Sequence, residues 1–407
     1  MLSDGGIYNC NDDLTMILID KPYVSGFLKS TLKRNRISVI RTEAASELLE
    51  NESLVFLSQE DAVEQFRNGN DRLLYCNSEN SISWIEQHLK FTDLPSQIAL
   101  FKNKHTFRNL LHDLYPGFFY TVISLDQLES FDCKGLPFPF IIKPSVGFFS
   151  LGVYKVECFE EWESTLQNLK SEIRRIETLY PPEVLNTGQF IIEECIQGEE
   201  FAIDCYFNDH GLPVVLDILK HLFSSGKDVN DRVYITSKDI IGTYKDQMGT
   251  FLSEVGSRAS LKNFPAHVEV RIDEKGHIAP IEFNPMRFGG WCSTPDLAWH
   301  AWGMNVYEYF FQGKEPDWNQ LLQNKDDLIF SNIVLNNSTG IQGKDIQSFD
   351  YDKLWSEFDK PLELRKTDFK KFPLFGFLFA ETKKDNMEEL NRILHSDLTE
   401  YIQDGTC

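Results

Sequence analysis

The sequence predicts an α+β fold, in which an N-terminal α/β domain precedes a strand-rich centre and a C-terminal capping subdomain. Between about residues 13 and 93, short apolar runs alternate with amphipathic helical segments, an order typical of a small parallel sheet covered by helices. From 138 to 284 the order becomes strand, loop, strand, helix and three strands, followed by a long insertion and a final hairpin. Such irregular order indicates mixed α+β packing rather than repeated βαβ units.

The individual elements follow from local pattern. LTMILID at 14–20 predicts the first strand, and Ser25 is a candidate N-cap for a helix that begins with GFLKSTLKRN. Two helices are expected between 97 and 136, with a turn at Tyr115-Pro116-Gly117 and then a short strand. The charged segment 159–179 predicts a solvated amphipathic helix to which we attach no function.

We expect three domains, because 407 residues suit two to three units of about 150 residues each. The changes in element order place an N-terminal domain at 1–96, a central domain at 97–312 and a C-terminal subdomain at 313–407. A small lid subdomain is expected at about 137–195. No GxGxxG follows the first strand, so the N-terminal domain has little of the dinucleotide-binding pattern.

The charge composition limits the kinds of ligand that the protein is expected to bind. Asp and Glu number 62 against 40 Lys and Arg, which gives a formal net charge of -22. Such a chain has no general attraction for nucleic acid or for an anionic membrane. A polyanionic ligand would need a local basic pocket and a divalent cation to offset its charge.

Cysteine usage and the first residues predict a cytoplasmic protein. The eight cysteines form no CxxC pair, so we expect reduced thiols and neither a disulfide framework nor a zinc site. The opening MLSDGGIYNCNDDL lacks a basic region followed by an apolar one, unlike a secretory signal. No apolar run approaches the roughly 18 residues of a membrane span.

The first candidate ligand-binding segment is 138–157, in which a β run ends at Lys143. A loop with small residues and hydroxyls follows, and then a second β run. Glycine lets backbone N–H groups approach a phosphate, hydroxyls add donors and the lysine adds charge. The loop residues of interest are Ser145, Gly147, Ser150 and Gly152.

A second candidate is the turn that joins two β runs at about 190–207. It carries Glu193, Glu194 and Glu200. Carboxylates accept hydrogen bonds from amines and hydroxyls, while backbone groups at a strand end can pair with the edge of a flat base. A solvated acidic turn is the alternative interpretation.

Lys104, taken alone, is interpreted as a surface lysine.

The third segment, 267–290, predicts a hairpin with a turn at 274–276. Alternation places the apolar side chains on one face: Val268, Val270, Ile272, Ala279, Ile281 and Phe283. It places the polar side chains on the other: His267, Glu269, Arg271, Glu282 and Asn284. Two carboxylates and a carboxamide on one face are the hard oxygen donors that Mg²⁺ prefers. A solvated polar face is the alternative.

In this order, the segments resemble the ATP-grasp superfamily, which includes biotin carboxylase, D-alanine–D-alanine ligase and carboxylate–amine ligases such as the L-amino-acid ligases. The resemblance covers roughly residues 100–312, and more weakly the N-terminal segment as a pre-ATP-grasp domain. It implies that Lys104 and Lys143 bind ATP phosphates and that the loop from Ser145 to Gly152 covers them. IIEECI matches the family's adenine hinge, which assigns the adenine amino group to Glu193 and the base edge to the backbone of Glu194 and Ile196.

The resemblance also assigns the remaining ligands. Glu200 falls on the family's ribose-binding position, and its metal ligands correspond to Glu269, Glu282 and Asn284, which would bind Mg²⁺ or Mn²⁺. Arg287 resembles the arginine for a substrate carboxylate or acyl phosphate, although NPMRFGG has one residue more than the usual NPR. Further substrate candidates are Lys220, His221 and Gly289.

The implied activity is that of an ATP-dependent carboxylate–amine or carboxylate–thiol ligase that forms an acyl phosphate and releases ADP and phosphate. Lys143 and Arg287 would act on the reacting groups, and the partners would be a small carboxylate and an amine, without nucleic acid or membrane. A homodimer is possible within the superfamily. The alternatives are a biotin-carboxylase-like enzyme, a non-catalytic ATP-binding regulatory module, and a structural or interaction protein.

Overall fold

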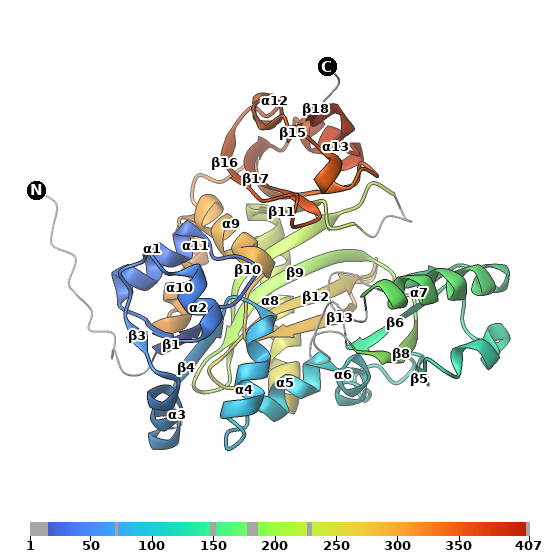
Figure 1. The fold of residues 1–407 in the computed structure, drawn as a ribbon, viewed down its shortest axis with the longest axis horizontal. Coiled ribbons are helices and arrows are strands. Elements are labelled where there is room, and N and C mark those ends of the chain that lie inside the picture. The colour runs from blue at the N-terminus through green and yellow to red at the C-terminus, as the bar shows by residue number, and fades with distance from the viewer. Residues whose placement is uncertain (1–14, 70–71, 147–151, 177–185, 226–229, 404–407) are drawn as a thin grey trace, which may run out of the picture.

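The computed structural model describes residues 15–69, 72–146, 152–176, 186–225 and 230–403 (Figure 1). The N-terminal residues lie beside the large central sheet, a small sheet projects on the other side of it, and the C-terminal residues lie above (Figure 1). Within the described ranges, no helix is both long enough and apolar enough to cross a membrane.

The N-terminal α/β segment is a four-stranded parallel sheet in the order β3-β2-β1-β4, as its alternating pattern predicts. Its strands are β1 (Thr15–Leu18), β2 (Ser38–Ile40), β3 (Phe56–Leu57) and β4 (Leu73–Cys76). Its helices are α1 (Gly26–Asn35), α2 (Glu43–Leu48), α3 (Gln59–Asn68) and α4 (Ile82–His88). Ser25 caps α1 as predicted, since its hydroxyl accepts from Leu28 N at 3.0 Å.

Two short helices, α5 (Leu94–Lys102) and α6 (Lys104–Leu110), connect this sheet to the rest of the chain. The side chain of Asn103, between them, caps α6. Helix α5 packs on the large sheet, where the Phe101 and Phe283 rings stack with centroids 3.8 Å apart. The charged residues at the α5–α6 junction are therefore held close to that sheet.

The small sheet has a core of its own. Its antiparallel strands lie in the order β5-β8-β6-β7: β5 (Tyr120–Ser124), β6 (Phe140–Val146), β7 (Tyr154–Val156) and β8 (Asn186–Glu194). The predicted charged helix is α7 (Trp162–Ile176), whose apolar face packs on this sheet through Trp162 and Leu169. This core is separate from that of the large sheet, and its role as the expected lid stays a prediction.

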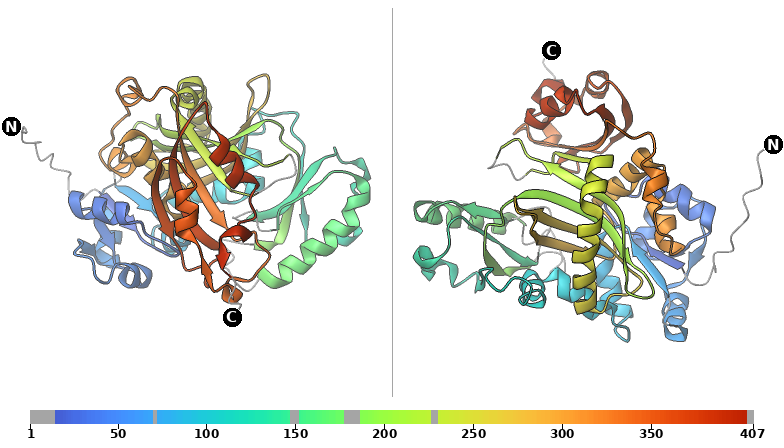
Figure 2. Two further views of the ribbon diagram at one scale, coloured as in Figure 1. Left: turned by 90° about the horizontal axis from the view of Figure 1, so that it is seen from above. Right: turned by 180° about the vertical axis from the view of Figure 1, so that it is seen from behind.

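The large sheet has eight antiparallel strands in the order β13-β12-β9-β10-β11-β14-β17-β16. Their bounds are β9 (Glu199–Phe207), β10 (Pro213–Leu222), β11 (Val233–Ser237), β12 (Phe264–Ile272), β13 (Ile278–Pro285), β14 (Leu328–Asn336), β16 (Pro361–Lys366) and β17 (Leu374–Lys383). The long helix α8 (Lys238–Ala259) runs along one face (Figure 2, right). The other helices that accompany this sheet are α9 (Ser293–Trp302), α10 (Val306–Phe311) and α11 (Trp318–Leu321).

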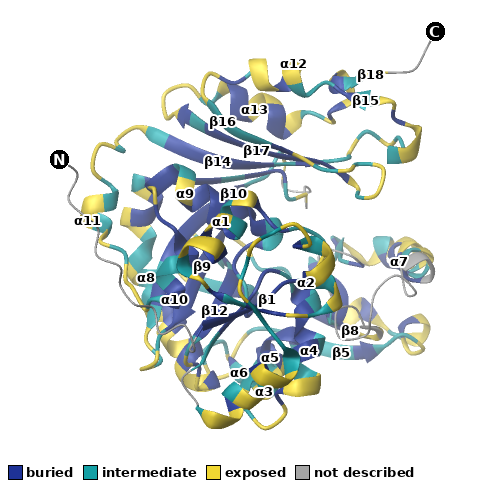
Figure 3. Cartoon of the chain, turned by 60° about the vertical axis from the view of Figure 1, so that its left-hand side comes forward, coloured by how far each residue is buried: buried dark blue, intermediate teal, exposed yellow. Residues whose placement is uncertain are grey.

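The C-terminal residues share this sheet, since β14, β16 and β17 extend it. They add a two-stranded sheet and two short helices: β15 (Ser348–Phe349), β18 (Ile402–Gln403), α12 (Tyr351–Ser356) and α13 (Glu388–His395). The strands of the large sheet are mostly buried, whereas α12 and the outer loops are exposed (Figure 3). The division into three domains at 96 and 312 stays a prediction.

The β12–β13 hairpin has the predicted polar face, on which Glu269 lies opposite Glu282 and His267 lies opposite Asn284. The predicted apolar face is wrong in one strand. A bulge just before Glu282 leaves Ile281 unpaired and places Pro280 opposite Val270, so Pro280 is buried while Ala279 and Ile281 are only partly buried. The turn lies where predicted, and Gly276 takes a φ of 82° there.

Asp217 on β10 is an unusual residue in the core of the large sheet, because its side chain is fully buried without a cationic partner among the described residues. Its Oδ1 accepts from Thr236 Oγ1 at 2.9 Å and from Trp302 Nε1 at 3.2 Å, while Oδ2 has no partner. Burial, which outweighs these hydrogen bonds, raises the pKa of Asp217 to about 7.

We predict that Asp217 makes the protein less stable as the pH rises from about 4 to 7. The unfolded carboxyl ionises near 3.8, but the folded one keeps its proton up to about 7. Folding therefore takes up a proton, and the free energy of unfolding falls across this window by up to about 4 kcal/mol. Urea denaturation at several pH values should show this fall in the wild type, and Asp217→Asn should remove that part of it. Parallel pH profiles for the two proteins would contradict the assignment.

Candidate active site

The predicted metal ligands lie together on the polar face of the hairpin. Glu269 and Glu282 are paired neighbours, and Asn284 is buried two pairs further along the hairpin. Lys104 from α6 reaches this face and donates to Glu282 Oε1 at 2.9 Å. In the described part of the chain, no three Asp, Glu, His or Cys side chains are already gathered as a metal cluster.

The two facing carboxylates have opposite pKa shifts. Burial, together with the charge of Glu282, raises the pKa of Glu269 well above its usual range. Burial alone would raise the pKa of Glu282, but the charges of Lys104 and Lys102 outweigh this effect and lower the pKa of that carboxyl. A divalent cation would let both carboxylates ionise, so this donor set fits Mg²⁺ or Mn²⁺.

The predicted phosphate-binding residues begin on β6. Lys143 is buried and forms an ion pair with Glu193. Two positions further along, the Ser145 hydroxyl is buried without a partner among the described residues, as expected of a donor that a phosphate oxygen would satisfy. Gly152 has a φ of 70°, which favours glycine, whereas Gly147 and Ser150 lie outside the described residues.

The predicted adenine hinge joins β8 of the small sheet to β9 of the large one. The Glu193 carboxylate is buried and points to Arg108 and Lys143. Burial would raise its pKa, but these two cations lower it to about 2. The Glu194 N–H donates to Phe119 O at 3.0 Å. The Ile196 carbonyl accepts from the Arg271 side chain of β12 at 2.8 Å.

The predicted ribose ligand Glu200 lies at the start of β9 and is held by two basic side chains. His221 Nδ1 lies 2.9 Å from Oε1, and Arg271 donates to Oε2 at 3.0 and 3.1 Å. Burial opposes its ionisation, but these partners lower the pKa of Glu200. The neighbouring candidate Lys220 contacts Glu199 at the surface. The structure therefore places His221 beside the nucleotide candidates and Lys220 further out.

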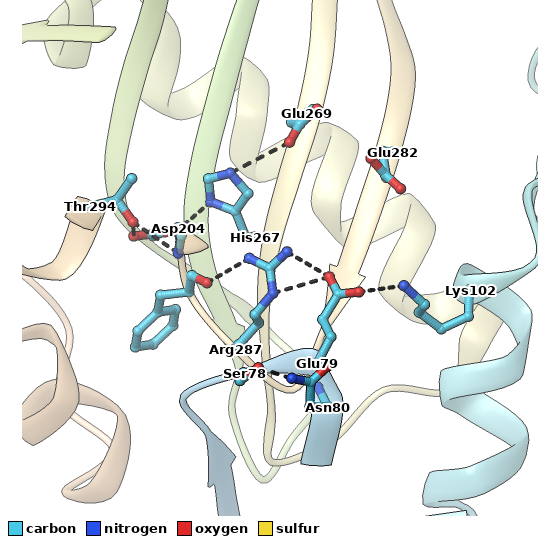
Figure 4. Close-up of polar contacts among 12 residues, drawn as sticks. Ser78, Glu79, Asn80, Lys102, Asp204, His267, Glu269, Glu282, Arg287 and Thr294 are labelled. Atoms are coloured by element: carbon cyan, nitrogen blue, oxygen red, sulfur yellow. Dashed lines mark hydrogen bonds and ion pairs between the residues drawn. The ribbon is translucent and has the colours of Figure 1, made fainter. Parts of the chain in front are cut away.

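Arg287 follows the hairpin and reaches Glu79, which lies just after β4 of the N-terminal sheet (Figure 4). Its Nε donates to Glu79 Oε1 at 3.0 Å, and Lys102 binds the same carboxylate from the opposite side (Figure 4). Burial would raise the pKa of Glu79, but both cations lower it to about 2. Sequence reasoning missed Glu79. The available signal was its position at the carboxyl end of a parallel strand, where ligand sites commonly form.

A second buried carboxylate, Asp204 on β9, joins the hairpin to the loop after Arg287 (Figure 4). Its Oδ1 lies 2.7 Å from His267 Nδ1 and accepts from Gly289 N at 3.0 Å, while Thr294 donates to Oδ2. A Cβ on Gly289 would lie 2.1 Å from Thr294 Oγ1, so only glycine fits there. Asp204 was not predicted, and it explains Gly289 as a packing requirement.

The comparisons with known proteins concern the domain family and the fold. Residues 136–295 match the ATP-grasp domain family. The chain resembles the L-amino acid ligase from Bacillus licheniformis with a TM-score of 0.67 at 17% identity, covering 96% of this chain and 98% of that one. It resembles N5-carboxyaminoimidazole ribonucleotide synthetase from Thermotoga maritima with a TM-score of 0.62 at 13% identity, covering 96% and 99%. No curated protein matches the sequence.

A third similar structure was solved with ligands. It is the biotin carboxylase domain of the Hydrogenobacter thermophilus 2-oxoglutarate carboxylase, in complex with MgADP, ADP and bicarbonate. The TM-score is 0.57 at 12% identity, and the match covers 91% of this chain and 86% of that one. These structural likenesses confirm the predicted fold.

Residues 136–295 therefore form an ATP-grasp domain, and the chain as a whole has the ATP-grasp fold.

We predict that Glu79→Gln destabilises the folded protein, because it leaves two buried cations without their carboxylate. Breaking such a pair typically costs about 3 kcal/mol or more in the free energy of unfolding. Urea denaturation at neutral pH measures this loss in the free energy of unfolding. Glu129→Gln, which removes an exposed ion pair with Lys170, is the matched control and should leave the midpoint unchanged. Equal midpoints for the two variants would show that Glu79 is not an essential charge partner.

Proposed function

We propose that this protein is an ATP-dependent ligase that joins a carboxylate to an amine through an acyl phosphate. The observation that carries the proposal is the facing pair Glu269 and Glu282 with Asn284, in a chain with an ATP-grasp domain. Lys104 and Lys102 lie beside this pair. A thiol in place of the amine fits the same chemistry. The substrates we favour are amino acids, because the similar Bacillus licheniformis protein is an L-amino acid ligase.

The nucleotide would lie between the small sheet and the hairpin. In this arrangement Lys104 and Lys143 offset phosphate charge, and Ser145 and Gly152 flank the phosphates from the small-sheet side. The hinge backbone at Glu194 and Ile196 would read the adenine edge. Bound Mg²⁺ or Mn²⁺ would supply charge neutralisation, held by Glu269, Glu282 and Asn284.

Four more candidates would complete the nucleotide and substrate sites. The Glu193 carboxylate would accept from the adenine amino group, and Glu200 would accept from the ribose hydroxyls. His221, which contacts Glu200, would orient that carboxylate, while Lys220, which contacts Glu199 at the surface, stays a substrate candidate at the same strand end. The roles of Glu193 and Glu200 follow from the family pattern, and each of these carboxylates already accepts charge-assisted hydrogen bonds in the structure.

The chemistry then needs only positioning. A carboxylate oxygen of the first substrate attacks the γ-phosphorus, and the bond from that phosphorus to the ADP oxygen breaks. The amine nitrogen next attacks the acyl carbon, phosphate leaves, and the nitrogen loses a proton. Arg287 stabilises the negative charge that develops on the acyl group, and the closed lid excludes the water that would hydrolyse it.

Arg287 is already neutralised by Glu79, so substrate binding exchanges one carboxylate partner for another. Asp204 fixes the loop that carries Arg287 through Gly289 and Thr294, and this restricts where its guanidinium can move. A guanidinium that is held in place loses little entropy when it binds a second carboxylate.

We predict that Glu282→Gln abolishes the Mg²⁺-dependent part of stabilisation by nucleotide. With a non-hydrolysable ATP analogue at about 100 times its Kd, the wild type should gain about 2.7 kcal/mol. Thermal shift with and without Mg²⁺ measures the gain. Glu274→Gln, on the exposed turn of the same hairpin, is the matched control and should behave as the wild type. A Glu282→Gln protein that keeps the full Mg²⁺ effect would contradict the proposed metal site.

A further inference from the structure

Arg108 on α6 connects the two sheets that the proposed nucleotide would lie between. It donates from Nε to Glu193 Oε2 at 2.8 Å and from one terminal nitrogen to Glu193 Oε1 at 3.1 Å. Its other terminal nitrogen donates to the Pro280 carbonyl on β13 at 2.6 Å. One side chain thus bridges β8 of the small sheet and the hairpin that carries the candidate metal ligands.

Glu193 has two cationic partners of different kinds. Lys143 binds Oε1 alone, whereas Arg108 binds both carboxylate oxygens. The carboxylate is about 2% exposed, so water cannot replace a lost partner. If Lys143 turns away, both oxygens of Glu193 still accept from Arg108.

Arg108 itself is fixed. Its side chain is buried, and each of its three nitrogens donates to an acceptor. Its guanidinium lies 4.8 Å from the centre of the Phe118 ring. Lys143 makes one ion pair through a flexible four-carbon stem. Of the two cations, Lys143 is the one that can change partners.

We infer that Arg108 is a positioning residue which keeps Glu193 paired and thereby releases Lys143 to bind the nucleotide phosphates. The inference rests on the proposed function, since it takes Lys143 as a phosphate ligand. Without Arg108, Lys143 would be the sole partner of a buried carboxylate. Moving it to a phosphate would then leave that carboxylate unpaired, which buried sites tolerate poorly.

The test is the affinity for ATP analogue and ADP, measured by calorimetry, of Arg108→Met and of the double variant Arg108→Met with Glu193→Gln. Methionine keeps most of the stem without the charge. We expect Arg108→Met to bind at least about 10-fold more weakly than the wild type. The double variant should recover most of this loss, because a neutral amide does not retain Lys143. Glutamine also keeps an acceptor oxygen for the adenine amino group.

Two further variants keep the test interpretable. Arg108→Lys retains the charge and should bind with intermediate affinity, even if Arg108→Met folds poorly. Lys170→Met, which removes an exposed ion pair of the small-sheet unit, should bind as the wild type. Recovery in the double variant separates a charge effect from general damage, because a merely structural role would make two substitutions no better than one.

The outcomes separate the two proposals. A wild-type protein that binds no nucleotide would overturn the proposed function. A wild type that binds, with Arg108→Met binding equally well, would overturn the role of Arg108 alone. The same holds if the double variant binds no better than Arg108→Met.

Discussion

The rest of the site depends on the pairing of three buried cations in one short segment, residues 102–108. Lys102 binds Glu79 of the N-terminal unit, Lys104 binds Glu282 of the hairpin, and Arg108 binds Glu193 of the small sheet. Unpaired buried charges are costly, so each pair fixes one unit of the fold to α5 and α6. A stretch of seven residues thereby sets the relative positions of the N-terminal sheet, the hairpin and the lid.

This pairing explains how a chain with a net charge of -22 can be prepared for a polyanion. The cations that we assign to ligands already have carboxylate partners: Lys104 has Glu282, Lys143 has Glu193, and Arg287 has Glu79. A phosphate or substrate carboxylate would replace a partner of the same charge. Binding therefore changes the pairing within a fixed network and requires little new desolvation of the cations.

Much of the fold and of the hairpin could be predicted from local pattern. Alternation placed Glu269 and Glu282 on one face of the hairpin, where the structure pairs them, because a two-residue period leaves few registers that bury the apolar face. The bulge at Ile281 could not be predicted, because it depends on how Pro280 packs against β12 and on the hydrogen bond that the Pro280 carbonyl accepts from Arg108. Glu79 and Asp204 were also missed, since their partners Arg287 and His267 lie 208 and 63 residues away in the chain. Polar partners so distant in sequence carry no local periodic signal.

The most direct test of the proposed ligase chemistry follows oxygen from substrate to phosphate. Amino acids labelled with ¹⁸O in the carboxylate are incubated with the protein, ATP, Mg²⁺ and a pool of amines, and the released phosphate is analysed by mass spectrometry. An acyl phosphate transfers one carboxylate oxygen to the phosphate that leaves, so we predict one ¹⁸O per phosphate released. Phosphate that is released without label would contradict the acyl-phosphate mechanism, and nucleotide binding without any turnover would contradict the proposed ligase.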